Sequence, residues 1–80
     1  MKLTYYFTDK IARTGISYTG RVLVSNFIEA ELNGLGKNNR HVLMNRIRKA
    51  SEIQKVAVMR IFDEAVAGRR FSIGVENKGL

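Results

Sequence analysis

Cysteine and proline are absent from this 80-residue sequence, and histidine occurs only once. Without cysteine the chain has neither a disulfide nor a thiolate metal site. This points to a reducing compartment or to a fold that is indifferent to redox conditions. A single histidine without cysteine also argues against a zinc site. We therefore expect no metal and no cofactor.

Long apolar runs are also missing. No stretch is long enough to cross a bilayer as a helix. Polar residues interrupt the region where the apolar part of a signal peptide would lie, namely Thr4, Thr8, Asp9 and Lys10. The sequence thus predicts a cytoplasmic chain that does not associate with membranes.

Acidic residues are few, with seven Asp and Glu against fourteen Lys and Arg, so the formal net charge is +7. Such a balance favours an anionic partner. The acids offer little for catalysis, because Asp63 and Glu64 are neighbours on an outer helical face. The glycines at 34 and 36 lack the rest of a phosphate-binding loop. We expect no enzymatic activity.

The clearest helix signals lie in the stretch 37–70, which also holds nine of the fourteen cations. Ser51 and Gln54 have the spacing of a capping box. Gly68 is a natural stop, because glycine enters the left-handed cap conformation cheaply. These signals predict a helix at about 52–67. One arc of it should face the core, formed by Val58, Ile61, Phe62, Ala65 and Val66.

The segment 38–50 also has a helical pattern. Asn38 or Asn39 can cap its start, and Leu43, Ile47 and Ala50 line one side. The alternative is one long kinked helix that continues to Ala67. The capping box at Ser51 argues against that alternative.

Alternation of apolar and polar residues predicts three strands. The segment 2–8 alternates, with Leu3, Tyr5 and Phe7 on one side. The segment 15–24 fits a strand better than a helix, because its apolar residues scatter around a helix axis; Gly20 would then mark a bulge. The segment 70–76 alternates cleanly.

A short helix at 26–33, capped by Ser25 or Asn26, completes the predicted order. We therefore expect an α+β fold in a single domain, 1–80, with a frayed terminus at 77–80. A small antiparallel sheet of strands 2–8, 15–24 and 70–76 would pack against helices 26–33, 38–50 and 52–67.

The concentrated basic residues predict a nucleic-acid-binding or regulatory protein, because they can neutralise several phosphates. The interleaved Asn38, Asn39 and Asn45 can hydrogen-bond phosphates or base edges. Tyr5, Tyr6 and Tyr18, if they lie on strands, can stack on unpaired bases. Whether the partner is DNA or RNA stays open. The candidate binding residues are Lys37, Arg40, Arg46, Arg48, Lys49, Arg69 and Arg70.

Two other functions use different residues. Ile53, Val56 and Arg60 lie on the outer side of the last predicted helix, and this apolar patch predicts a partner protein or a homodimer. The chain would then be a protein-binding module or inhibitor that docks on an acidic site. A less favoured alternative is a metal-free ribonuclease that uses His41, whose unperturbed pKa lies near neutrality.

Overall fold

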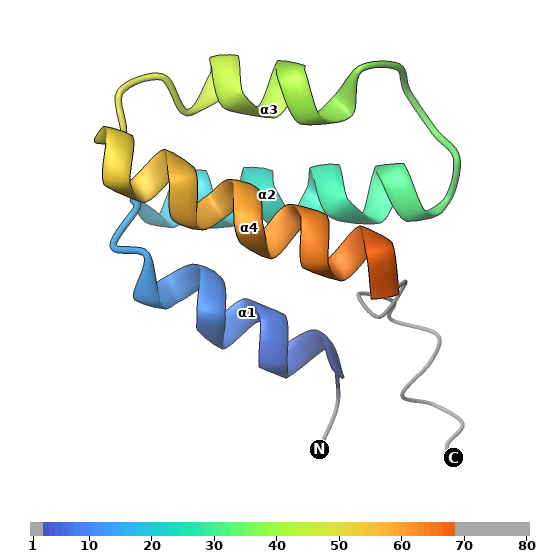
Figure 1. Ribbon diagram of the computed structural model, residues 1–80, viewed down its shortest axis with the longest axis horizontal. Helices are drawn as coiled ribbons and strands as arrows, with labels where there is room; N and C mark the ends of the chain where they lie inside the picture. The colour runs from blue at the N-terminus through green and yellow to red at the C-terminus, as the bar shows by residue number, and fades with distance from the viewer. Residues whose placement is uncertain (1–2, 69–80) are drawn as a thin grey trace.

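The computed structural model describes residues 3–68, with side chains from residue 7 onward. In this part of the chain all regular secondary structure is helical, and short loops join the helices (Figure 1). It forms α1 (Leu3–Arg13), α2 (Tyr18–Leu32), α3 (Asn39–Arg46) and α4 (Glu52–Gly68). No strand occurs in these residues. The predicted α+β class, with its antiparallel sheet, is therefore wrong. The predicted strand at 70–76 and the frayed end at 77–80 lie outside the described residues.

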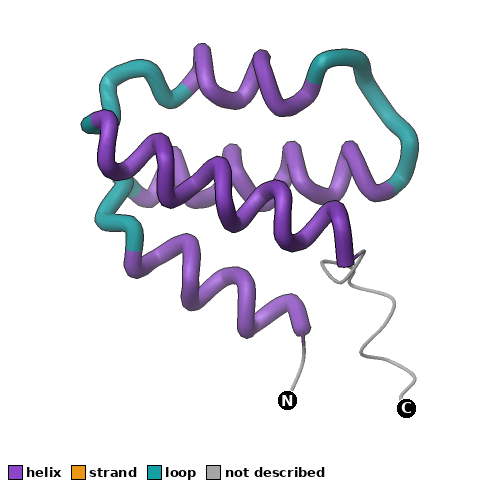
Figure 2. The backbone as a smooth tube through the Cα atoms, viewed as in Figure 1, coloured by secondary structure: helices purple, strands orange, loops and turns teal. Residues whose placement is uncertain are grey.

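Consecutive helices run in opposite directions, as the tube in Figure 2 shows. α2 and α4 lie in the middle and contact each other and both remaining helices, whereas α1 and α3 lie on opposite sides and do not touch. Because of this order, the turn from α3 to α4 lies at the same end of the molecule as the start of α2.

The core lies between the four helices. It contains a continuous cluster of buried apolar side chains to which every helix contributes. Burial of these side chains is the main force that stabilises such a small fold. The cluster consists of Phe7, Ile11, Ile16, Val24, Ile28, Leu43, Ile47, Val58, Ile61, Phe62 and Ala65.

The segment 2–8 was predicted as a strand, but residues 3–8 lie in α1. Phe7 and Ile11 are both buried and are four residues apart, which is the spacing of one helical face. The predicted strand stopped at Thr8 and left Ile11 in a loop. A short alternating run cannot distinguish a strand from a helix when the next apolar position is ignored.

The segment 15–24 was also predicted as a strand, and it forms the first half of α2 instead. Ser17 caps the helix by accepting a hydrogen bond from the N–H of Gly20 at 3.1 Å. The buried residues Gly20, Val24 and Ile28 recur every four positions. The expected bulge at Gly20 is therefore wrong. The helix predicted at 26–33 is present, but as the second half of α2 and without a start of its own at Ser25 or Asn26. Exposed apolar residues, Tyr18 and Val22, had made the helical pattern look scattered.

The two later helices agree better with their predictions. The capping box of α4 is present, since Ser51 N–H donates to Gln54 Oε1 at 3.0 Å and Gln54 N–H donates to Ser51 Oγ at 3.1 Å. The predicted inner arc of α4 faces the core. α3 ends at Arg46, four residues earlier than predicted, and Asn38 caps it without a side-chain hydrogen bond.

The turn between α1 and α2 packs closely on the start of α4. Gly15 has a φ of +85°, and a Cβ atom there would lie 3.1 Å from Nε2 of Gln54. Glycine suits both the positive φ and the limited space. Gly15 and Gln54 both line the groove that forms the candidate site.

Candidate nucleic-acid interface

The C-terminal end of α3 carries three cations in four residues. Arg46 is the last residue of the helix, and Arg48 and Lys49 follow in the turn to α4. All three side chains are exposed. None of them forms a salt bridge with an acid of the described residues. Their charge is therefore available to a ligand.

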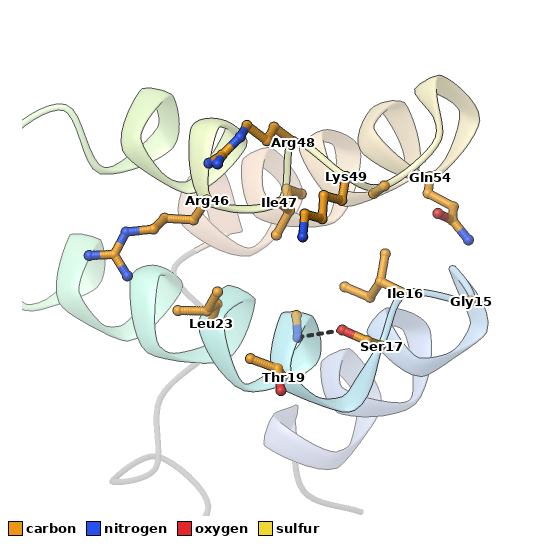
Figure 3. A pocket seen from close by; sticks show the side chains of 12 residues that line it. Gly15, Ile16, Ser17, Thr19, Leu23, Arg46, Ile47, Arg48, Lys49 and Gln54 are labelled. Carbon is orange, nitrogen blue, oxygen red and sulfur yellow. Dashed lines mark hydrogen bonds between the residues drawn. The ribbon is translucent and has the colours of Figure 1, made fainter.

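These three cations border one groove of about 460 Å³ between the turn and the start of α2. Figure 3 shows Lys49 extending toward α2, whereas Arg46 reaches out over that helix and Arg48 turns back along α3. Apolar side chains from Ile16 and Leu23 also line the groove. No Asp or Glu is among its lining residues, so the groove is positive.

The first turn of α2 adds to this positive field. Backbone N–H groups at a helix start are unpaired within the helix, and the helix dipole is positive there. Ser17 satisfies the N–H of Gly20, and no acid lies in the first turn. An anion between Lys49 and the start of α2 would therefore meet a cation and a positive dipole end together.

The α3 helix itself favours cations at this end. Its C-terminal carbonyl groups form the negative end of the dipole, where basic side chains are stabilising. Arg48 makes a long contact of this kind, from Nη1 to the carbonyl oxygen of Asn45 at 3.5 Å. The cations are thus placed without an acidic side chain that would cancel their charge.

The N-terminal end of α3 differs. Arg40 forms a bidentate pair with Asp63 of α4, at 2.8 Å from Nε to Oδ1 and 2.9 Å from Nη2 to Oδ2. The hydrogen bond to Asp63, and then the charge of that carboxylate, raise the pKa of Arg40, so the guanidinium stays protonated. Arg40 was predicted as part of the binding set, and in the structure its charge is already paired with that of Asp63.

Asn39 is likewise committed to the fold. Its side chain is buried, and its Nδ2 donates to the carbonyl oxygen of Leu35 at 2.7 Å and to Oε1 of Glu31 at 3.0 Å. The sequence had suggested that this amide can bind phosphates or base edges. Because it is buried and already hydrogen-bonded, it cannot reach such a ligand. Asn45 is exposed, and its Nδ2 lies 3.4 Å from Nε2 of His41.

Another of the predicted cations, Lys37, does not join the groove. Lys37 is exposed in the loop before α3, at the opposite end of that helix. Arg69 and Arg70 lie outside the described residues. The preceding residue, Gly68, ends α4 far from the α3–α4 turn (Figure 1). Of the five predicted residues that the structure describes, three border the groove.

The predicted partner residues lie on the outer face of α4. Ile53 is 83% exposed and Val56 is 47% exposed. Arg60 is exposed as well, and it makes no ion pair with a described acid. Tyr18, proposed to stack on bases from a strand, lies instead at the start of α2, with Arg21 at 5.7 Å from its ring centre.

The sequence did not indicate that Ser17 and Thr19 line the groove beside the cations. The prediction of a strand at 15–24 hid the helix start that brings them there. The detectable signal is the four-residue spacing of Ile16, Gly20 and Val24, which continues to Ile28.

The chain matches no protein-family model, no curated protein and no solved structure. Within residues 3–68, no helix is long and apolar enough to cross a membrane. In the same range, no group of three acidic or histidine side chains is placed to hold a metal ion.

Proposed function

We propose that this protein binds nucleic acid through the basic groove formed by Arg46, Arg48 and Lys49. The observation that supports this proposal is that three exposed cations border one groove that no acid lines. Phosphate groups are the ligands that such a surface attracts, and they supply most of non-specific affinity for nucleic acid.

The proposed contacts are to the phosphate backbone, which DNA and RNA share. Arginine can bind a phosphate through two N–H groups, whereas lysine acts as a point charge. A phosphate beside Lys49 would also face the start of α2. Contacts of this kind orient a protein on nucleic acid without reading its sequence. The proposal includes no catalytic step, and a cytoplasmic location stays part of it as a prediction.

A titration of duplex DNA, single-stranded DNA and RNA at two salt concentrations, about 50 and 200 mM, tests the proposal. We expect binding that weakens steeply with salt. Three phosphate contacts on duplex DNA correspond to a log–log slope of roughly −3. Fluorescence anisotropy of labelled oligonucleotides measures both the affinity and the slope.

Two further outcomes of the same experiment distinguish nucleic-acid binding from the alternative functions. RNA recovered after long incubation should be intact, because no nuclease activity is proposed. Its cleavage would instead support the ribonuclease hypothesis, in which His41 takes part in the reaction. Absence of binding to all three nucleic acids at the lower salt concentration would contradict the proposal. An acidic protein surface would then be the better candidate partner.

A further inference from the structure

The outer face of α4 carries an apolar patch between two opposite charges. Ile53 and Val56 are its exposed apolar residues. Glu52 precedes them and Arg60 follows them on the same face, since residues three or four apart are neighbours on a helix. The exposed Ile53 and Val56 therefore form a small apolar centre flanked by opposite charges.

The charges at the two ends of this patch form no short ion pair among the described residues. The Glu52 side chain is 89% exposed, and its one ion pair within the described residues, with Lys55, is 3.7 Å long. Arg60 has no acidic partner among the described residues. Each charge therefore keeps the capacity to pair with an opposite charge on another molecule.

Their positions are symmetric about Val56. Glu52 lies four residues before it and Arg60 four residues after it, which is about 6 Å along the axis in each direction. A two-fold axis beside Val56 that packs two α4 helices antiparallel would place Glu52 of each copy next to Arg60 of the other. A parallel pair would instead bring Glu52 to Glu52 and Arg60 to Arg60.

We propose that a second copy of this chain covers the outer face of α4, in an antiparallel helix pair centred on Val56. In a two-fold symmetric interface the same patch serves both subunits and must be self-complementary. The patch of α4 meets this condition in its charges, which form two reciprocal Glu52–Arg60 pairs around an apolar centre.

The surface beside α4 also offers a place for Ile53. A shallow hollow of about 380 Å³ lies between α1 and α4, lined by Arg13, Thr14, Ala57, Ile61 and others. Arg60 borders this hollow as well. The two-fold axis brings Ile53 of the second copy to the level of Met59, since it lies three positions from Val56. Ile53 is on the side of α4 that faces the hollow, so each copy can insert this side chain into the other.

Cysteine cross-linking tests the geometry, because the chain has no native cysteine. A disulfide requires Cα atoms within about 7 Å. Val56→Cys should give a cross-linked dimer on oxidation, since the two copies of residue 56 meet at the axis. The control is Ala67→Cys, also exposed on α4. It lies eleven residues away, so its two copies would be roughly 33 Å apart.

Charge exchange tests the pairing. Sedimentation equilibrium should show weaker dimers for Glu52→Arg and for Arg60→Glu, and recovery in the double variant that carries both changes. A merely destabilised fold would not recover in this way. Ile53→Lys should weaken association roughly 100-fold, because two isoleucines leave the interface. Circular dichroism melting of each variant checks that the monomer is still folded.

Several outcomes would overturn the proposal. One is a strict monomer at millimolar concentration. Another is cross-linking of Ala67→Cys as efficient as that of Val56→Cys, which indicates a parallel pair. A third is a double variant that associates no better than the single ones. All these measurements are made without nucleic acid, so their outcomes do not depend on whether the basic groove binds it.

Discussion

The two ends of α3 carry similar side chains and differ in what those side chains contact. At the N-terminal end, Arg40 is paired with Asp63 and the buried Asn39 donates to Glu31. At the C-terminal end, Arg46, Arg48 and Lys49 have no acidic partner among the described residues. One end of the helix is bound into the fold, and the other end is open to a ligand.

The cause of this difference lies on other helices. Glu31 is the last but one residue of α2, and Asp63 lies on α4. Both acids come close to the start of α3, whereas the groove at its C-terminal end has no acidic lining residue. A run of basic residues therefore predicts a binding surface only where the fold brings no acid to it.

The largest effect should come from neutralising the open end. Replacing Arg48 and Lys49 together by Gln should weaken duplex DNA binding roughly 50-fold at about 0.1 M salt, because two counterion-releasing contacts are lost. The salt slope should flatten by about two units. Anisotropy titrations at several salt concentrations measure both quantities.

The matched control neutralises the other end with Lys37→Gln and Arg40→Gln. It removes the same formal charge from the same protein. We expect the slope to change by less than one unit, because Asp63 already matches Arg40. Equal losses in the two double variants would mean that the ends of α3 do not differ in binding.

A second prediction concerns stability, for which changes at the N-terminal end of α3 should have larger effects than changes at its C-terminal end. Asn39→Ala should lower the free energy of unfolding by about 2 kcal/mol, since it removes two hydrogen bonds and leaves the carbonyl oxygen of Leu35 without its donor. Asn45→Ala is the control at the open end. Its side chain is exposed and makes only a 3.4 Å contact, so urea denaturation should show little change.

The smallest predicted effect comes from opening the closed end. Asp63→Asn removes the carboxylate that pairs with Arg40. One more cation then becomes free, and duplex DNA should bind more tightly, by at most roughly eightfold at about 0.1 M salt. The combination of Asp63→Asn with Arg40→Gln should cancel this gain. A gain that persists in the combined variant would show that the loss of an acid, and not the freed Arg40, is responsible.

The accuracy of the sequence predictions follows the range of the interactions that decide each element. α4 was predicted to within one residue because its start depends on Ser51 and Gln54, which are three positions apart. α1 and the first half of α2 were predicted as strands. Their helical spacing shows only when Ile11 is added to Phe7 and Ile28 to Val24, beyond the short alternating windows.

For the candidate site too, some properties follow from the sequence and others only from the fold. The excess of positive charge and its concentration in the stretch 37–70 can be read from the sequence by itself, and they are the basis for predicting an anionic partner. The tertiary structure alone decided which cations are free. Asp63 pairs with Arg40 from a position 23 residues further along the chain. The start of α2 lies beside Lys49 because the helices pack around a shared core. Charge is a property of each residue, but its neutralisation depends on distances between helices, and only packing sets those distances.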